Sequence, residues 1–458
     1  SKGIYEKVKG AYSSTVVLLL LGALLTFIKG LDYEEAIILI VVYVLLFLSR
    51  DNFYRETAPI KMKNVLKMIL ITAIMSFIYA IISYSVVGHF KYILVPGKRE
   101  VFIEAGLIFL TVWIITGLFL FIRVKRVKFT PPDDEDIKEL EKFLSTNKGN
   151  IMTHLLFLKD KYFYYTKDKQ MLIPFATIRD KLVVLGEPIG NQDFLEEAIT
   201  EFRKFADRYA MVPVLYEISD KYFSIYHDYG YDFLKLGEEA LIDLKEFNLT
   251  GKKKKDLRLA KNKVVSGELQ FEIVSPPFDE KFFEELKEVS DEWLGNRSER
   301  GFSLGWFDRD YLSRAPIAVM KKDGRIIAFA NLMPLYDNET MSIDLMRSKS
   351  DIPSGTMDAM FILLMEWSKE QGYNYFNLGM APLSNVGATP YSRNVEKLIG
   401  RLFQRGNKIY SFSGLRKYKE KFQPRWESRY LAYPKGINIS ILLLQLVMLT
   451  SKHNKNIK

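Results

Sequence analysis

The sequence contains no cysteine and few histidines, and these shortages exclude several kinds of site. Without cysteine, the 458-residue chain has no disulfide framework, no cysteine-ligated zinc site and no thiol nucleophile. The four histidines lie far apart, at His89, His154, His227 and His453. This spacing disfavours a histidine metal cluster, and the sequence offers few candidate histidines for a Ser-His-Asp triad. We therefore expect no bound metal.

Charge is absent from the middle of four long apolar stretches in the first part of the chain. The stretches are Tyr12–Leu31, Tyr33–Ser49, Val65–Val87 and Val101–Ile122. Each is close to the ~20 residues that a helix needs to cross about 30 Å of hydrocarbon. The sequence therefore predicts a transmembrane region of about four helices over residues 1–128.

Basic residues flank these stretches unevenly. Lys and Arg gather before the first stretch, between the second and third, and after the fourth, whereas acids accompany Lys29 between the first two. Because positively charged loops tend to stay in the cytoplasm, we expect both ends of the region, and the domain that follows, to be cytoplasmic. A cleavable secretory signal is not expected, because the first apolar run is long and three more follow it.

A basic region with alternating strand and helix patterns follows the apolar part. The net charge of +10 favours an anionic partner, either nucleic acid or lipid headgroups. Two similar halves, 129–245 and 246–435, predict a duplicated α/β fold. The predicted strands are Met171–Ile178, Lys181–Leu185, Met211–Glu217, Ile317–Met320, Ile326–Met333, Thr340–Leu345 and Tyr375–Leu378, and the predicted helices are Asp193–Tyr209 and Thr356–Gln371.

A lysine-rich segment, 251–263, lies between the halves. On a helix, one sector would carry Lys254, Lys255, Arg258 and Lys261, beside an apolar line. This pattern predicts a helix that docks by its apolar line and binds phosphates with its basic strip. A solvated charged face is the alternative.

The region 397–429 interleaves Lys and Arg with aromatic residues. Basic side chains can follow phosphates and aromatic rings can stack on unpaired bases. The alternative is that most of these aromatic residues belong to the last strand and helix of a core.

A short apolar stretch, 436–450, precedes Lys452, Lys455 and Lys458. It is too short for a comfortable membrane span. We expect residues 436–458 to form a helix on the membrane surface with a basic tail, and a simple packing helix is the alternative.

Polar residues stand at the ends of two predicted strands of the second half. Asp344 lies near the end of one strand, and Arg347 follows where that strand stops. The carboxylate can take a proton or hold an amine, and the guanidinium can hold an anion, with a structural ion pair as the alternative. On the other strand, Asn377 and the N–H groups around Gly379 could serve a developing oxyanion, or Gly379 could be only a turn residue.

Four long motifs occur in a fixed order: Gly301–Asp308 (GFSLGWFD), Ile343–Arg347 (IDLMR), Phe376–Leu383 (FNLGMAPL) and Lys419–Tyr430 (KEKFQPRWESRY). Together with the lysine-rich segment they resemble the cytoplasmic domain of the phosphatidylglycerol lysyltransferases, or multiple peptide resistance factors. The resemblance covers roughly residues 133–434. The preceding helices resemble the last spans of that family's larger membrane region, so most of its lipid-flipping part would lie outside this sequence.

The resemblance implies tandem acetyltransferase-like (GNAT) repeats with the basic helix between them. It also implies transfer of an aminoacyl group, usually lysine and in some members alanine, from tRNA to phosphatidylglycerol, which gives resistance to cationic antimicrobial peptides. No ATP, metal or other cofactor is expected, because the aminoacyl ester is already activated. The implied partners are lysyl-tRNA or another aminoacyl-tRNA, phosphatidylglycerol and the bilayer, while assembly into a homo-oligomer stays open.

The resemblance also suggests roles for single residues. Positions matching Asp344 and Arg347 are implicated in activity: Asp344 would take the hydroxyl proton of the lipid or fix the substrate amine, and Arg347 would hold a phosphate of the lipid or of the tRNA end. The tRNA stem would lie on Lys254, Lys255, Arg258 and Lys261. Candidates for contact with the lipid or the aminoacyl end are Ser303, Asn377, Gly379, Lys421 and Arg425.

Coenzyme A enzymes of this fold hold a pyrophosphate on a glycine-rich loop, but the matching stretch, Arg347–Thr356, has one glycine and an inserted proline. Acyl-CoA is therefore a poor donor candidate. Two alternatives stay open: a tRNA-dependent transferase that acts on a peptide or peptidoglycan precursor, and a non-catalytic membrane receptor for RNA or acidic lipid.

Overall fold

The computed structural model describes residues 2–5, 7–30, 33–56, 70–75, 77–78, 81, 106–107, 109–111, 129–398 and 412–451. These residues belong to two compact units. One comprises Ser1–Lys128 with Phe205–Met211, and the other comprises Phe129–Lys204 with Val212–Lys458. Most residues of the third and fourth apolar stretches lie outside the described residues, so the structure does not test whether these stretches span a membrane.

The described part of the first apolar region is helical. Helix α1 covers Lys2–Tyr5, α2 covers Lys9–Gly30 and α3 covers Tyr33–Leu48, and α2 packs against α3. Of the described residues, Lys9–Phe27 forms a helix long and apolar enough to cross a membrane, whereas the apolar part of α3 is shorter. The helices predicted over the first two apolar stretches are thus confirmed as helices, and the number of spans stays a prediction.

The described residues from Phe129 onward form a mixed α/β structure around one sheet of 12 strands. The strand order is β1-β2-β3-β5-β12-β6-β11-β10-β9-β8-β7, with β4 paired to β2. The strands are β1 Tyr162–Tyr165, β2 Met171–Ile178, β3 Lys181–Leu185, β4 Ile189–Gly190, β5 Val212–Ile218, β6 Tyr231–Asp243, β7 Gln270–Val274, β8 Ile317–Lys322, β9 Arg325–Pro334, β10 Thr340–Ser348, β11 Tyr375–Pro382 and β12 Arg425–Pro434.

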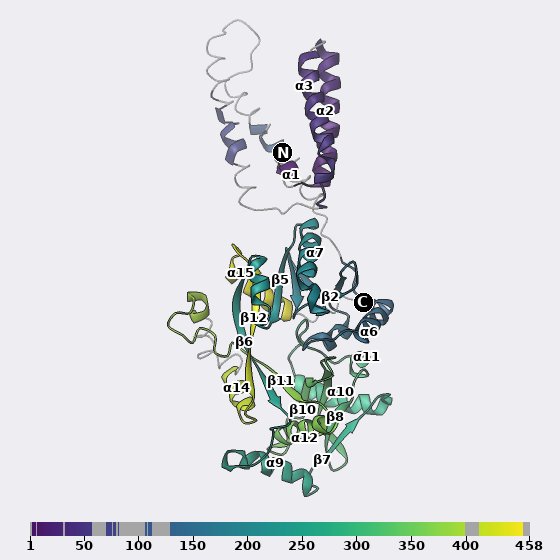
Figure 1. Cartoon of the computed structure of the whole chain (residues 1–458), viewed down its shortest axis with the longest axis vertical. Helices are drawn as coiled ribbons and strands as arrows, with labels where there is room; N and C mark the ends of the chain where they lie inside the picture. The colour runs from purple at the N-terminus through teal and green to yellow at the C-terminus, as the bar shows by residue number, and fades with distance from the viewer. Residues whose placement is uncertain are drawn as a thin grey trace. The chain divides into compact units, whose positions relative to one another are not determined.

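Helices cover this sheet and connect its strands (Figure 1). They are α6 Asp134–Leu144, α7 Leu195–Arg208, α8 Phe223–Asp228, α9 Lys255–Val265, α10 Glu280–Leu294, α11 Arg309–Leu312, α12 Thr356–Glu370, α14 Phe412–Glu420 and α15 Ile439–Thr450. Short 3₁₀ turns include Thr153–Leu158 and Lys252–Lys254, the second leading directly into α9. From residue 129 onward, every strand and helix predicted from the sequence is present. β10 and β11 continue beyond their predicted ends, through an irregularity in the pairing of each. The prediction that Asp344, Arg347 and Gly379 stand at strand ends is therefore wrong, because all three lie within strands.

The two halves have a similar core arrangement. In the first half β3 and β5 are parallel neighbours separated in sequence by α7, and in the second half β10 and β11 are parallel neighbours separated by α12. A parallel pair needs a crossover connection, which each helix supplies. This arrangement is the mixed α/β, GNAT-like fold that the sequence analysis expects.

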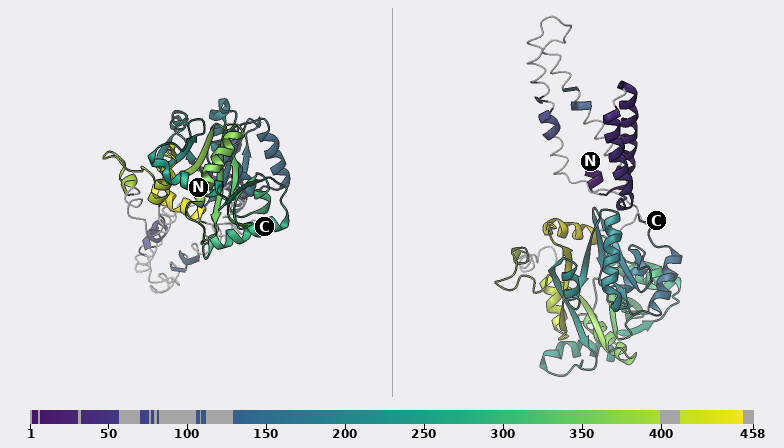
Figure 2. Two further views of the ribbon diagram at one scale, coloured as in Figure 1. Left: turned by 90° about the horizontal axis from the view of Figure 1, so that it is seen from below. Right: turned by 45° about the horizontal axis from the view of Figure 1, so that its top comes forward.

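The last strand joins the halves. Strand β12 pairs antiparallel with both β5 and β6, and β6 in turn pairs with β11. Figures 1 and 2 show the yellow β12 among the teal strands of the first half. A segment from the end of the second half therefore completes the sheet of the first, and one sheet runs through both.

Irregular pairing marks the middle of this sheet. Pairing shifts at Asp344 in β10, at Gly379 in β11 and at Glu217 in β5. Glu217 has a left-handed backbone with φ 64°, which is uncommon for a residue with a side chain. Because β-bulges redirect side chains and occur often beside functional sites, these positions point to a site at the centre of the sheet.

Candidate active site

The site begins where two parallel strands separate. β10 and β11 pair only from Thr340–Ser342 and Tyr375–Asn377, although both strands continue well beyond these residues. Asp344 and Gly379 each lie two residues past the last pair. The two residues therefore occupy equivalent positions on the two strands, just beyond the point where the strands stop forming backbone hydrogen bonds with each other.

Asp344 is held by two hydrogen-bond donors. The backbone N–H of Gly305 donates to Oδ1 at 3.0 Å, and the hydroxyl of Tyr311 donates to Oδ2 at 2.8 Å. Burial raises the pKa of Asp344, while the two hydrogen bonds and the nearby Lys161 and Arg347 lower it. A carboxyl group with an upward-shifted pKa in the interior is suited to proton transfer or to binding an amine.

Gly305 leaves no room for a side chain beside this carboxylate. A Cβ atom at this position would lie 1.7 Å from Oδ2 of Asp344. The close approach brings the Gly305 N–H within hydrogen-bonding distance of the carboxylate. Contact with Asp344, and not turn geometry, thus explains why a glycine occupies position 305 of the motif Gly301–Asp308.

Arg347 is buried and paired. Its side chain is 2% exposed, and its two terminal nitrogens form a bidentate pair with Glu299, with both distances 2.8 Å. Oε1 of Glu299 also accepts the backbone N–H of Phe307 at 3.2 Å. Through Glu299, Arg347 fixes the loop that carries Gly305. In the described part of the chain its Nε has no hydrogen-bond partner, so one donor remains.

Lys419 of α14, which was not predicted as a site residue, binds β11 where that strand leaves β10. It is 5% exposed, and Nζ donates to the carbonyl oxygens of Gly379 and Met380, each at 2.8 Å. Desolvation by burial lowers the pKa of Lys419 to about 7, although Glu239 opposes the shift. A large fraction of this side chain is therefore a neutral amine near pH 7, which can accept a proton.

Lys419 and Tyr311 were missed because their sequence signals are weak. Lys419 opens the motif Lys419–Tyr430, but its charge resembles that of the exposed Lys417 two residues earlier. Tyr311 lies on a four-residue helix, α11, and reaches Asp344 only through the tertiary fold. The sequence clue to Lys419 is that it belongs to this motif. Nothing in the sequence spacing indicates that Tyr311 contacts Asp344.

Three of the predicted ligand-binding residues lie around the divergence. Ser303 is hydrogen bonded to the phenol of Tyr216. The side-chain oxygen of Asn377 accepts the N–H of Gly379 at 2.7 Å, and its backbone oxygen accepts the hydroxyl of Ser342 at 2.9 Å. Asn377 therefore braces the bulge, and the Gly379 N–H already has a partner in this conformation.

The other two predicted ligand-binding residues form ion pairs. Lys421 pairs with Asp358 of α12 at 3.1 Å. Arg425 pairs with Glu427 at 2.8 Å, and its guanidinium lies over the ring of Tyr375, 5.8 Å from the centroid. Their roles in binding the lipid or the aminoacyl end stay predictions.

An acidic group adjoins Lys419. Burial, followed by the nearby Glu239, raises the pKa of Glu217 to about 8. Glu239 accepts Nε of Arg429 at 2.8 Å and stands opposite Met380, whose carbonyl accepts Lys419. The phenol of Tyr216 links Glu217 to Ser303. Because Glu239 is paired with Arg429 and the raised pKa keeps Glu217 protonated near pH 7, a cation bound here would favour the ionised form of Glu217.

A cavity of about 940 Å³ is lined by Asn377 and Arg429, whereas Asp344, Lys419 and Glu217 are not among its lining residues. Its lining comes from both halves and includes Glu187, Asn377, Glu427 and Arg429. Ligand pockets commonly measure about 300–1,000 Å³, so this cavity has the volume of a ligand pocket.

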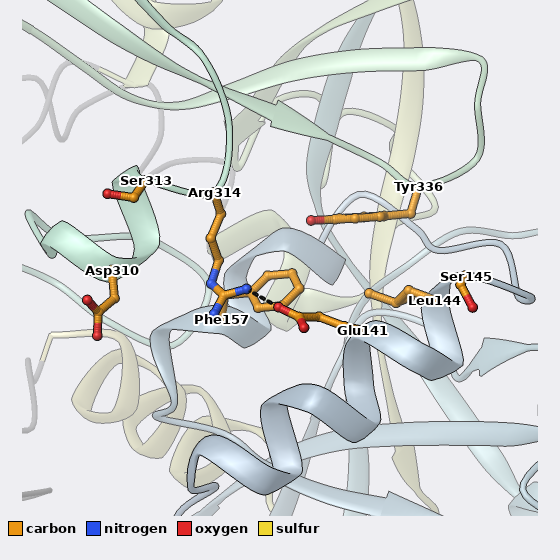
Figure 3. Close-up of a pocket in the computed structure, with 8 residues that line it drawn as sticks. All are labelled: Glu141, Leu144, Ser145, Phe157, Asp310, Ser313, Arg314 and Tyr336. Carbon is orange, nitrogen blue, oxygen red and sulfur yellow. Dashed lines mark hydrogen bonds and ion pairs between the residues drawn. The ribbon is translucent and has the colours of Figure 1, made fainter. Parts of the chain in front are cut away.

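A second cavity, of about 620 Å³, has Asp310, Arg314 and Tyr336 among its lining residues. Figure 3 shows the ion pair between Arg314 and Glu141 next to the ring of Phe157. The buried His154 stacks between this region and Tyr311, and burial lowers its pKa to about 3. His154 is therefore neutral and suited to a packing role.

The lysine-rich segment forms η4 and α9, and it is docked as predicted. Leu257 is buried, and most of the predicted tRNA-binding side chains have partners within the protein. Nζ of Lys254 and the guanidinium of Arg258 donate to backbone carbonyls, and Lys261 pairs with Glu366 at 2.6 Å. Their contact with tRNA stays a prediction.

The cations that remain open on this segment are Lys252, Lys253 and Lys255. All three are exposed, and none has an ion-pair partner among the residues that the structure describes. Across the same described residues, no group of His, Asp and Glu side chains could hold a metal ion.

Comparison with known proteins gives consistent results. Residues 141–433 match the family model "Phosphatidylglycerol lysyltransferase, C-terminal". Phosphatidylglycerol lysyltransferases from Bacillus subtilis and Staphylococcus aureus are 39% and 35% identical over 99% and 94% of this chain. The chain spans about half of these relatives, 54% and 52% of their lengths. The solved structure of L-PGS from Bacillus licheniformis is 44% identical, with a TM-score of 0.64 over 71% of this chain and 100% of that one.

Proposed function

The chain belongs to the phosphatidylglycerol lysyltransferase family, and from that premise we propose that it transfers lysine from lysyl-tRNA to a glycerol hydroxyl of phosphatidylglycerol. The observation that carries the proposal is the divergence of β10 and β11, where two donors hold Asp344 of β10 and Lys419 binds carbonyl oxygens of β11. An uncatalysed ester exchange has no group to position the amine of the substrate and no group to accept the hydroxyl proton. Asp344 would supply the first and Lys419 the second.

The proposed reaction exchanges one ester for another. The lipid hydroxyl attacks the aminoacyl carbonyl, a new C–O bond forms, and the bond to the ribose oxygen of tRNA breaks. Neutral Lys419 takes the hydroxyl proton and returns it to the departing ribose oxygen. Asp344, held by Gly305 and Tyr311, binds the α-ammonium of the lysyl group. Arg347 acts as a positioning residue through Glu299.

The acidic group beside Lys419 supports lysine as the transferred amino acid. Glu217 and Glu239 are both buried, with Arg429 paired to Glu239. An ε-ammonium group would relieve the cost of these buried carboxyl groups, whereas an alanyl methyl group would not. We therefore expect the lysyl side chain to extend toward Glu217.

The tRNA is proposed to lie along η4 and the start of α9. Lys252, Lys253 and Lys255 are exposed there and can contact the phosphate backbone. Arg258 and Lys254 hold the segment in shape by binding carbonyl oxygens of the preceding loop.

The remaining finer assignments are also proposals. The parallel pairs β3–β5 and β10–β11 support tandem GNAT-like repeats. The apolar helices and the basic residues that flank them support a multi-pass membrane protein with a cytoplasmic catalytic domain. Modification of phosphatidylglycerol would reduce the negative charge of the membrane and with it the attraction of cationic antimicrobial peptides.

The test is transfer of radiolabelled lysine or alanine from charged tRNA into vesicles with or without phosphatidylglycerol. We expect lysine label in a lipid only when phosphatidylglycerol is present. Asp344→Asn and Lys419→Ala should lower the rate about 10²–10⁴-fold, as expected for lost acid–base groups. Lys417→Ala, on the same helix but exposed, is the matched control and should retain the rate.

Two outcomes would contradict the proposal. Label in an aqueous peptide or precursor, with none in lipid, would identify a different acceptor. Binding of tRNA without any transfer, unaffected by Asp344→Asn, would indicate a receptor.

A further inference from the structure

Helix α15 is apolar on both its inner and its outer face. Leu442 and Leu446 are buried and belong to the same core as Phe302, and the helix packs against β2. The outer face carries large exposed side chains. Their exposed fractions are 52% for Ile441, 59% for Leu444, 62% for Val447 and 40% for Met448.

The exposed side chains form one stripe along the helix. Positions 441, 444, 447 and 448 follow the spacing of a single helical face, and Ile439–Thr450 contains no charged residue. Single exposed leucines are common, but a continuous row of this kind marks a surface that binds an apolar partner.

A bilayer is the partner that the chain itself favours. Lys452, Lys455 and Lys458 follow the helix in sequence and carry no intervening acid, so they complement anionic headgroups. The 12 residues of α15 extend only about 18 Å, which is too short to cross about 30 Å of hydrocarbon. With its inner face packed, the helix fits lying flat at the lipid surface.

The helix is also connected to the loop that holds Asp344. The backbone oxygen of Thr450, at the end of α15, accepts the N–H of Gly301 at 3.3 Å. Gly301 begins the motif in which Phe302 packs into the shared core and Gly305 binds Asp344. A lipid contact at α15 therefore bears on the position of the active-site loop.

We propose that α15 lies in the interfacial layer of an anionic bilayer, with Ile441, Leu444, Val447 and Met448 inserted among the acyl chains. This contact holds the loop Gly301–Asp308 at the level of the lipid headgroups. The choice of a lipid acceptor rests on the proposed function, whereas insertion of the helix can be measured without any activity.

The absence of cysteine from the sequence allows a direct test in the full chain. Leu444→Cys and Val447→Cys would each carry a single nitroxide label in nanodiscs that contain phosphatidylglycerol. We expect the labels to be more accessible to oxygen than to a water-soluble nickel chelate. Val265→Cys, on the exposed face of α9 and 75% exposed, is the aqueous control.

The labels also distinguish other occupants of this face. Equal accessibility at positions 444 and 265 would overturn the proposal. Shielding from both reagents, together with dipolar coupling between labels, would show that a second copy of the chain covers the helix, and would overturn it as well.

A transfer assay tests the connection to the active site. Leu444→Asp should lower transfer to vesicle phosphatidylglycerol at least tenfold and leave transfer to a monomeric short-chain phosphatidylglycerol nearly unchanged. Equal losses with both acceptors, in a protein with unchanged melting, would make α15 a packing helix. No transfer to either acceptor by the parent protein would refute the proposed function and leave the label measurement intact.

Discussion

Single residues at the site have properties that only their three-dimensional surroundings explain. Asp344 and its motif can be recognised in the sequence, and the structure gives it two donors and a raised pKa. Lys419 and Glu217 could not be selected, because burial and not residue type changes their protonation. Composition and residue spacing do not show which individual lysine or glutamate side chains are buried.

Substitution of Gly305 tests the close approach to Asp344. Gly305→Ala places a methyl group where the Asp344 carboxylate now lies, so we expect transfer to fall at least 100-fold with the global fold retained. The measurement is lysyl transfer to vesicle lipid. Leu304→Ala, an exposed neighbour, should keep near-parent activity, and equal losses in the two variants would contradict the explanation.

The pH dependence of transfer tests Lys419. Only the neutral amine accepts a proton, so kcat/KM should rise as pH increases through about 7 and then level off. Lys419→Arg should remove both the activity and this profile, whereas Lys417→Arg should leave the profile in place. Spontaneous hydrolysis of lysyl-tRNA must be subtracted at each pH. A profile that stays flat from pH 6 to 8 would assign the proton acceptor elsewhere.

Glu217 has a consequence for stability. Its folded pKa of about 8 lies above the unfolded value of 4.5, so the folded state holds the extra proton between these limits. Stability from this group is therefore present below about pH 4.5 and is lost as pH rises toward 8, by up to about 5 kcal/mol. Melting temperatures of Glu217→Gln should fall less over this range than those of the parent. The exposed Glu246→Gln should follow the parent curve.

At the scale of elements, hydrophobic alternation located seven of the twelve strands, and the long central strand β6 is among those it missed. This strand carries Glu238 and Glu239, both buried, and Gly237 in close contact with the backbone of β11. Two adjacent glutamates are typical of a solvent-exposed segment, so the pattern did not indicate a strand in the middle of a sheet. Their partners, such as Arg429 for Glu239, come from distant parts of the sequence.

The element η4–α9 can be tested through the salt dependence of tRNA binding. Replacing Lys252, Lys253 and Lys255 together by Gln should reduce the slope of log K against log salt by roughly two to three units. Arg258→Gln should change the slope less, because its guanidinium binds backbone carbonyls. Lys281→Gln on α10 is the exposed control. If the salt slope of the triple variant is unchanged, the lysine-rich segment is a solvated charged face that does not bind tRNA.

At the scale of the whole molecule, the sequence indicated two α/β halves but not one shared sheet. Strand β12 is separated by more than 180 residues from β6, its partner along most of its length. Such pairing depends on the final topology, which local periodicity does not contain. A single sheet therefore connects the two halves that the sequence separates.

A shared sheet predicts cooperative unfolding of the two halves. Leu431→Ala, in β12 and fully buried, should destabilise by about 2–5 kcal/mol. Because β12 joins β5 to β6, hydrogen exchange should accelerate in strands of both halves, including β3 and β10. Acceleration limited to the first half would show that the halves unfold separately.

The position of β12 also has a consequence for biosynthesis. As the chain is made, β5 and β6 leave the ribosome long before the strand that lies between them. Until residue 434 has emerged, each has an unpaired edge, and Lys419 cannot yet be fixed against β11 by a completed sheet. The newly made domain is therefore open to mispairing with other nascent chains until synthesis reaches β12, and the candidate site is completed only after that point.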